Sequence, residues 1–236
     1  MSKPAAETKA VSDLGRSGIY SVSEAAALIG TSRQKIRAWI DGWPKSGAPA
    51  IIENDLGWVD DRLAFSFANL MELRFVSVFV KAKVKIHAIR AVMNEVRAEL
   101  HRPHPFATNI VFRTDGKKII AETAHRNGVT RLYDLKSRNF EIGGIVYQTL
   151  KEDVIYDPKG DAEAWFPRRG MAPNVIVHPR LAFGRPVLRD TGIPTGAIAD
   201  AMRAERHIDT VAELFEISRR RVQEAVAFET QLHQAA

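Results

Sequence analysis

Two short stretches near the start of the chain place apolar residues at helical intervals, with polar residues between them. Residues 22–29 form the first stretch, whose apolar side chains follow one face of a predicted helix. Ser21 or Ser23 can cap the start of this helix, and Gly30 suits the left-handed conformation that commonly ends one. The pattern therefore predicts a helix that stops at a glycine, immediately before a second helix.

The second helix is predicted to begin after Thr31 or Ser32, either of which can cap it. Its apolar side chains fall on one face, and its cationic and amide side chains fall on the other. Such a face can donate hydrogen bonds to base edges and phosphates in the major groove of DNA. The candidate DNA-binding residues are Ser32, Arg33, Gln34, Lys35, Arg37 and, in the following loop, Lys45. The same pattern also fits a surface helix pair in an ordinary helical protein.

Two longer helices are predicted beyond a loop rich in turn-forming residues. The loop spans residues 43–59, and the helices are expected at 61–80 and 84–100. With the two short helices, this order resembles a MerR-type winged helix-turn-helix over residues 19–100, with the loop as its wing. The resemblance implies a DNA-binding domain at residues 19–105. The run HRPHPF then ends the last helix, where that family continues into a long dimerisation helix.

The chain on either side of this domain differs in composition. Residues 1–18 are polar and lack periodicity, which predicts a mobile tail. Residues 106–170 predict a small β-rich module, because short β-branched and aromatic runs alternate with turn signals. The first of these runs, at 110–113, precedes the hairpin signal Thr114-Asp115-Gly116.

Residues 171–236 predict two short strands followed by three helices. The strands are expected at 175–177 and 186–188. The expected helix caps are Thr195, Asp209 and Ser218. The link at 216–218 is short enough for a second helix-turn-helix.

Three consecutive arginines begin the last of these helices, where positive charge opposes the helix dipole. We expect such a start to cost stability unless an anion binds there. The candidate residues for contact with an acidic protein or with DNA are Arg219, Arg220, Arg221 and Gln223. The alternative is a solvated helix start, and the sequence does not separate an acidic protein from DNA as the partner.

The run HPRLAFGRPVLRDTGIPT, followed by AIAD and VAELFEISRRRVQEAV, is similar to the DUF433 antitoxin family over residues 174–229. The order of a MerR-like front, a β-rich middle and this rear segment is similar to a long variant of the VapB-like antitoxins. The resemblance implies an antitoxin, not an enzyme, that represses its own operon and neutralises a PIN-like ribonuclease toxin. The implied partners are double-stranded DNA of its own promoter and the toxin encoded nearby.

The composition is that of a globular protein, with 45% hydrophobic and 26% charged residues. The absence of cysteine excludes disulfides, thiolate catalysis and cysteine-ligated zinc. No apolar run is long enough for a membrane span and no signal peptide is evident, so we expect a cytoplasmic protein. The formal net charge of +6 permits a polyanionic partner without requiring one.

Together these features predict an α+β protein with three folded parts. They are an N-terminal MerR-like winged helix-turn-helix, a small β-rich middle module and a C-terminal helical domain that resembles a helix-turn-helix, at residues 171–236. We expect a homodimer whose chains meet through the middle and rear parts. The alternative function is a stand-alone MerR-type regulator that responds to a small ligand through the middle module.

An enzyme, most plausibly a nuclease, is the remaining hypothesis. Its candidate acids are Asp60, Asp61, Asp153, Asp157 and Asp161. No nucleophile–base pair or glycine-rich phosphate loop accompanies them, and the last two fit an ordinary turn. His101 and His104 flank prolines without further ligands nearby. We therefore assign no catalytic residue, no metal site and no cofactor.

Overall fold

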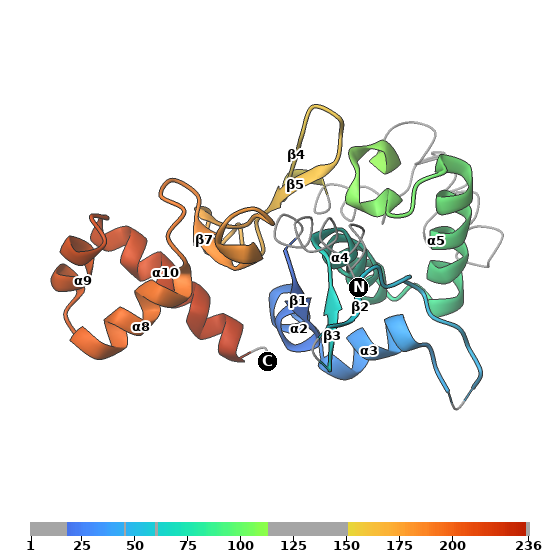
Figure 1. The fold of residues 1–236 in the computed structure, drawn as a ribbon, viewed down its shortest axis with the longest axis horizontal. Helices are drawn as coiled ribbons and strands as arrows, with labels where there is room; N and C mark the ends of the chain where they lie inside the picture. Colours follow the sequence, from blue (N-terminus) through green and yellow to red (C-terminus); the bar gives the residue numbers. More distant parts are fainter. Residues whose placement is uncertain (1–17, 45, 60, 113–150, 235–236) are drawn as a thin grey trace, which may run out of the picture.

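The computed structural model describes residues 18–44, 46–59, 61–112 and 151–234. This described part contains seven α-helices and two antiparallel sheets, which confirms the expected α+β class. In Figure 1, α2 to α5 gather around one sheet, while α8, α9 and α10 form a second lobe beyond the other sheet. Much of the predicted β-rich module, including its first hairpin signal, lies outside the described residues.

The two short helices of the front half lie where the sequence predicts them, as α2 (Val22–Ile29) and α3 (Arg33–Asp41). Ser21 caps α2 through a capping box, in which its hydroxyl accepts from the Glu24 amide and the Glu24 carboxylate accepts from the Ser21 amide. Gly30 ends α2 with a φ of 70°. This left-handed conformation is energetically unfavourable for residues that carry a Cβ atom. Local hydrogen bonds thus set both ends of α2.

A three-stranded sheet in the order β1-β3-β2 supports these helices. β1 (Tyr20–Ser21) and β2 (Gly57–Val59) each pair antiparallel with the central β3 (Arg62–Phe65). β2 lies at the end of the predicted loop, and β3 occupies the first residues of the helix predicted at 61–80. The hairpin of β2 and β3 therefore follows α3 along the chain.

The helix predicted at 61–80 begins only at Phe67, as α4 (Phe67–Lys81), so its expected start is wrong. Ser66 caps α4 by accepting a hydrogen bond from the Asn69 amide at 3.2 Å. The preceding residues form a strand because the wholly buried Phe65 pairs with Tyr20 across the sheet. Over so few residues, apolar spacing fits a strand as well as a helix.

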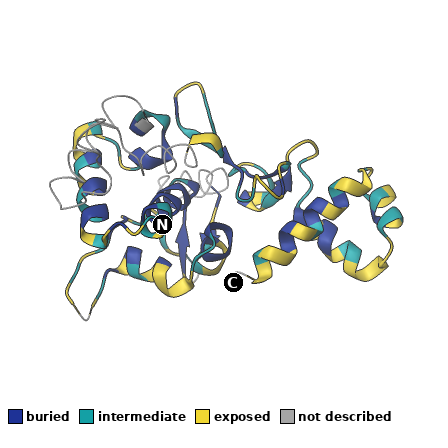
Figure 2. Cartoon of the chain, turned by 180° about the vertical axis from the view of Figure 1, so that it is seen from behind, coloured by how far each residue is buried: buried dark blue, intermediate teal, exposed yellow. Residues whose placement is uncertain are grey.

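The central helix of the front half is α4, most of whose residues are buried (Figure 2). The predicted fourth helix is α5 (Ile86–Leu100), which packs on one side of it. None of the helices in the described ranges is long and apolar enough to cross a bilayer.

Two 3-10 turns follow α5, η1 (Pro105–Ala107) and η2 (Asn109–Phe112). The second turn occupies most of the run at 110–113 that was expected to open the β-rich module. A turn is favoured here because the Thr108 hydroxyl accepts a hydrogen bond from the Ile110 amide at 3.3 Å, and this local bond competes with an extended backbone. Residues beyond 112 up to 150 are outside the described ranges.

The second sheet has four strands in the order β4-β5-β6-β7. β4 (Val154–Tyr156) and β5 (Ala162–Trp165) come from the predicted middle module. β6 (Val175–Val177) and β7 (Pro186–Leu188) are the two predicted strands of the rear segment. The expected boundary between residues 170 and 171 therefore falls between neighbouring strands of a single sheet.

The rear lobe consists of α8 (Thr195–Glu205), α9 (Ile208–Leu214) and α10 (Arg219–Gln234). Ser218 caps α10, as predicted, by accepting from the amide of Arg221 at 3.4 Å. Figure 1 places the C-terminal end of α10 beside the front half, and the structure records contacts between α10 and α2.

Two predicted caps in this lobe are wrong. Thr195 is the first residue of α8 and is wholly buried, and its hydroxyl bonds the carboxylate of Glu229 on α10. Asp209 lies in the first turn of α9, while His207 occupies the cap position without a side-chain hydrogen bond. Thr195 turns inward because the buried carboxylate requires a donor.

Candidate nucleic-acid interface

The predicted DNA-reading helix α3 has one buried and one exposed face. Ile36, Trp39 and Ile40 are buried against the front core. The side chains predicted to contact DNA on this helix are all exposed: Ser32, Arg33, Gln34, Lys35 and Arg37. The structure thus presents these five residues together, on the side of α3 that the core leaves free. Lys45, the sixth candidate, is outside the described residues.

The start of α3 is held by Ser32 rather than Thr31. The Ser32 hydroxyl accepts a hydrogen bond from the amide of Lys35 at 3.3 Å. The first turn of α3 contains no acidic residue. Its amides and its positive dipole end are therefore suited to an anion such as a phosphate.

Two cations from distant parts of the chain hold the turn between α2 and α3. Arg168 donates to the carbonyl oxygens of Ala27 and Leu28 at 3.1 and 2.8 Å. Lys81, at the end of α4, donates to the carbonyl of Ile29 at 3.3 Å. Burial, and then the nearby charges of Arg168 and Lys35, lower the pKa of Lys81. Neither Lys81 nor Arg168 was predicted as a site residue, because no local signal links either one to a turn so far away in sequence.

The predicted wing loop is divided into two parts. In the first part, Trp43 and Ala48 form an antiparallel bridge. Arg90 of α5 stabilises this part, because its guanidinium lies over the Trp43 ring and donates to the Pro49 carbonyl at 2.8 Å. The second part ends in β2, on which Trp58 is 65% exposed. Two projections, a loop and a hairpin, therefore follow α3.

The arginines at the start of α10 were expected to lack anionic partners, but two of them form ion pairs. Arg219 pairs with Asp209, and Arg221 pairs with Asp190 at 2.8 Å and with Glu224 at 3.2 Å. Carboxylates of the chain itself therefore compensate two of the three charges, so an external anion is not required. Arg220 and Gln223 are exposed.

The acids considered for a nuclease do not converge in the described part of the chain. Asp153 pairs with Arg74 at 3.3 Å, and Asp161 pairs with Arg102 at 2.8 Å. Asp157 accepts from the amides of Lys159 and Asp161 within the turn between β4 and β5. Asp60 is outside the described residues, and these residues contain no group of three or more acids or histidines placed to hold a metal.

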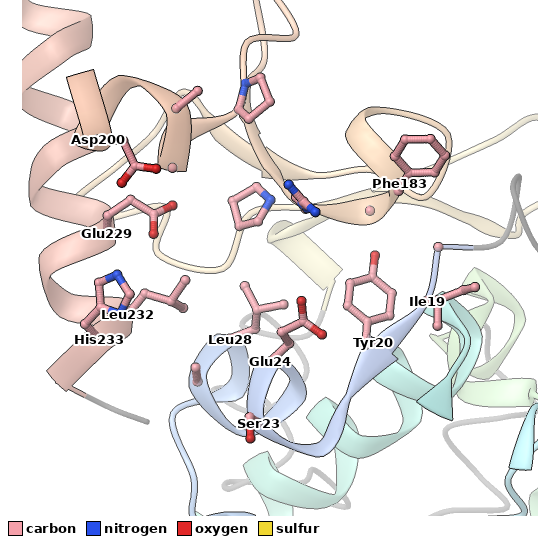
Figure 3. A pocket seen from close by; sticks show the side chains of 18 residues that line it. Ile19, Tyr20, Ser23, Glu24, Leu28, Phe183, Asp200, Glu229, Leu232 and His233 are labelled. Carbon is pink, nitrogen blue, oxygen red and sulfur yellow. The ribbon is translucent and has the colours of Figure 1, made fainter. Parts of the chain in front are cut away.

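A cleft of about 690 Å³ lies between the front half and the rear lobe (Figure 3). β1 and α2 form one wall, and the segment around Phe183 with α8 and α10 forms the other. The Tyr20 hydroxyl points toward this second wall and is buried without a partner among the described residues. Gly18 and Gly184 close over it, since a Cβ atom at Gly184 would lie 2.5 Å from the hydroxyl oxygen. Burial, with a smaller effect of the Glu24 charge, raises the pKa of Tyr20.

Comparisons with known proteins match the rear segment of the chain and, at lower identity, most of its length. Residues 175–228 match a family model described as "Protein of unknown function (DUF433)". A Mycobacterium tuberculosis protein with the provisional name antitoxin VapB45 is 22% identical over 226 residues, which cover 88% of this chain and 92% of that protein. The crystal structure of Rv2018 from Mycobacterium tuberculosis superposes with a TM-score of 0.72 at 21% identity, covering 88% of this chain and 96% of that one. The shared fold thus extends over most of both chains.

Proposed function

We propose that this protein is a DNA-binding antitoxin that represses its own operon and neutralises a PIN-like ribonuclease toxin encoded nearby. Its role is regulatory and not catalytic. The observation that carries the DNA-binding part is the exposed face of α3, where a capped helix start and four cationic or amide side chains lie together. Bidentate Arg and Gln contacts of this kind distinguish base pairs in the major groove.

The arrangement around α3 supports a winged helix-turn-helix of MerR type at residues 19–105. α2 and α3 meet at the tight turn of Gly30, and the hairpin of β2 and β3 follows them beside the same core. A single module of this kind reads a short half-site, so we propose a homodimer that reads two. The middle and rear parts, at 106–170 and 171–236, supply its contact surfaces.

The similarity to a protein named as an antitoxin supports the toxin-binding part, because it extends over 88% of this chain. We assign toxin contact to the rear lobe, where the family match lies. Arg220 and Gln223 offer exposed donors there. A PIN-like active site is a cluster of carboxylates, and the guanidinium of Arg220 could pair with one of them.

The DNA-binding part is tested by fluorescence anisotropy with the duplex from upstream of the gene. Arg37→Ala should weaken binding by about 1–3 kcal/mol if Arg37 contacts a base. Arg203→Ala, which removes another exposed helical arginine in the rear lobe, is the matched control and should leave the affinity unchanged. Equal affinity of the unmodified protein for the upstream duplex and a scrambled duplex would contradict this part.

The antitoxin part is tested by co-expression with the protein encoded next to this gene. We expect the two to co-purify, and we expect RNA cleavage by the neighbour to stop in the complex. A neighbour that remains active, or that elutes separately, contradicts the antitoxin part without affecting the DNA-binding part.

The cleft beside Tyr20 favours a second candidate, a regulator that responds to a small ligand. Mostly apolar clefts with a few polar groups are common ligand sites. Native mass spectrometry of protein purified from its own host decides between the two. A stoichiometric small molecule whose removal changes promoter affinity would favour the regulator.

A further inference from the structure

Two cations from distant elements contact the turn between α2 and α3, and a third cation lies on α3 just beyond this turn. Lys35 lies in the first turns of α3, Lys81 ends α4, and Arg168 follows β5. A Cβ atom built on Gly30 would lie 3.4 Å from Nη2 of Arg168 and 3.9 Å from Nζ of Lys81. The guanidinium and the ammonium therefore flank the glycine that leads into α3.

More positive charge lies near the end of α2 than is needed to offset its helix dipole. A single cation is enough to offset the negative end of a helix dipole, and here Arg168 and Lys81 both bond its last carbonyls. Among the described residues, no carboxylate forms an ion pair with Lys35, Lys81 or Arg168. Burial is the main cause of the lowered pKa of Lys81, and the like charges of Arg168 and Lys35 lower it further.

Donors remain for an additional acceptor at this turn. The hydrogen bond to Ile29 uses one of the three N–H groups of the Lys81 ammonium. The bonds of Arg168 to Ala27, Leu28 and Pro167 come from its two terminal nitrogens, and its Nε–H is not among these donors. The amides at the start of α3 lie directly beyond Gly30, so their positive dipole end adds to the same field.

We propose that Lys35, Lys81 and Arg168 together bind a backbone phosphate of the duplex whose bases α3 contacts. This inference rests on the proposed DNA-binding function. It extends the DNA interface beyond the helix-turn-helix to Arg168, in the connection between two strands of the second sheet. That sheet is continuous with the rear lobe, so the same contact would set the orientation of the rear lobe relative to DNA.

Lys81→Gln in the full chain is the principal test. A glutamine amide can still donate to the Ile29 carbonyl, so the variant removes the charge and keeps the capping hydrogen bond. We expect the plot of log affinity against log salt concentration to lose about one unit of slope, as for one phosphate contact. The ratio of affinities for upstream and scrambled duplexes should stay unchanged, because phosphate contacts carry no sequence information.

Lys83→Gln is the matched control, since Lys83 is exposed just beyond the end of α4 and should leave the slope as it is. Lys35→Gln and Arg168→Gln should each reduce the slope by about one unit, while Arg168→Lys should keep it. Circular dichroism and melting of each variant identify any that fail to fold. The Lys35 ammonium caps no carbonyl in the described structure, so Lys35→Gln should fold. It therefore provides the test if Arg168→Gln unfolds.

The outcomes separate this inference from the proposed function. If the unmodified protein prefers its upstream duplex but Lys81→Gln and Lys35→Gln keep its salt slope, the phosphate site is overturned and DNA binding stands. If these variants instead weaken only the association with the neighbour-encoded protein, the cluster is a protein-docking surface and the phosphate site is also overturned. If the unmodified protein does not bind DNA, both proposals fail.

Discussion

The Nδ1 atom of His104 lies 3.2 Å from Oε2 of Glu72, a side chain of α4 with no exposure to solvent. The Nε2 atom of the same ring lies 3.4 Å from Oδ2 of Asp55. Burial lowers the pKa of His104, but its hydrogen bonds to both carboxylates and their charges outweigh this effect and raise the pKa to about 9. A charged imidazole thus joins the loop before β2, the central helix and the segment after α5.

Stability should fall as the pH rises past neutrality because of this histidine. An unfolded histidine has a pKa of about 6.5. The contribution of the charged His104 to the free energy of unfolding is therefore complete below about pH 6.5. It is lost as the pH rises through about 9. Denaturant unfolding between pH 6 and 10 should show this decline, and His104→Gln should flatten it. His87→Gln, at an exposed position of α5, should keep the decline, and a variant of His104 with the unmodified pH profile would contradict the assignment.

At neutral pH, His104→Gln should lower the free energy of unfolding by about 2 kcal/mol, the size of a hydrogen bond to a charged group. The loss arises because the buried carboxylate of Glu72 would face Asp55 without the charge between them. Arg97 lies 3.9 Å from Glu72 and offsets part of this effect. Chemical denaturation against the unmodified protein measures the difference, and a change below about 0.5 kcal/mol would argue against a charged histidine.

Substitutions of Ser32 should separate helix stability from DNA affinity. Ser32→Ala removes the cap of α3 and should cost about 1 kcal/mol of stability. Ser32→Asp keeps a cap and suits the helix dipole, yet its charge should repel a phosphate and weaken promoter binding more than the alanine does. Ser21→Ala, at the cap of α2, should lower stability without this effect on DNA. Anisotropy titrations and melting curves give the two quantities, and tighter binding by Ser32→Asp would place the phosphates elsewhere.

The protein should be a dimer at micromolar concentration. One helix-turn-helix reads too short a site for useful specificity, and two-fold pairing is the usual solution. Light scattering should return about twice the 26.3 kDa mass of the chain. A mass of one chain at tens of micromolar, with or without the upstream duplex, would exclude a stable dimer.

Arg220→Glu should weaken retention of the neighbour-encoded protein, the proposed toxin, in a pull-down with the full chain. The side chain is exposed on α10, and reversing its charge should repel a carboxylate-rich partner. Arg206→Glu makes the same change at an exposed position after α8 and should retain the toxin. Arg37→Ala should also retain it, because we propose that Arg37 contacts DNA and not the toxin. Loss of the toxin with Arg37→Ala and not with Arg220→Glu would move the docking surface to the front half.

The sequence by itself determined the elements whose ends are set by neighbouring residues. Ser21 and Gly30 bound α2 through hydrogen bonds and backbone conformation that reach only a few positions along the chain. Ser218 marks the start of α10 in the same way, and the alternation of short apolar runs located β6 and β7. The exposed face of α3 also followed from helical periodicity alone.

Only the tertiary structure decided the features that depend on partners far away in sequence. Phe65 is in a strand because Tyr20 pairs with it, and Thr195 turns inward because Glu229 is buried beside it. Arg168 reaches Leu28 across 140 positions, so no local pattern could show that it adds charge to the turn before α3. The physical reason is the same in each case. Backbone capping is satisfied within one helical turn, whereas burial and charge pairing depend on whichever side chains the fold brings together.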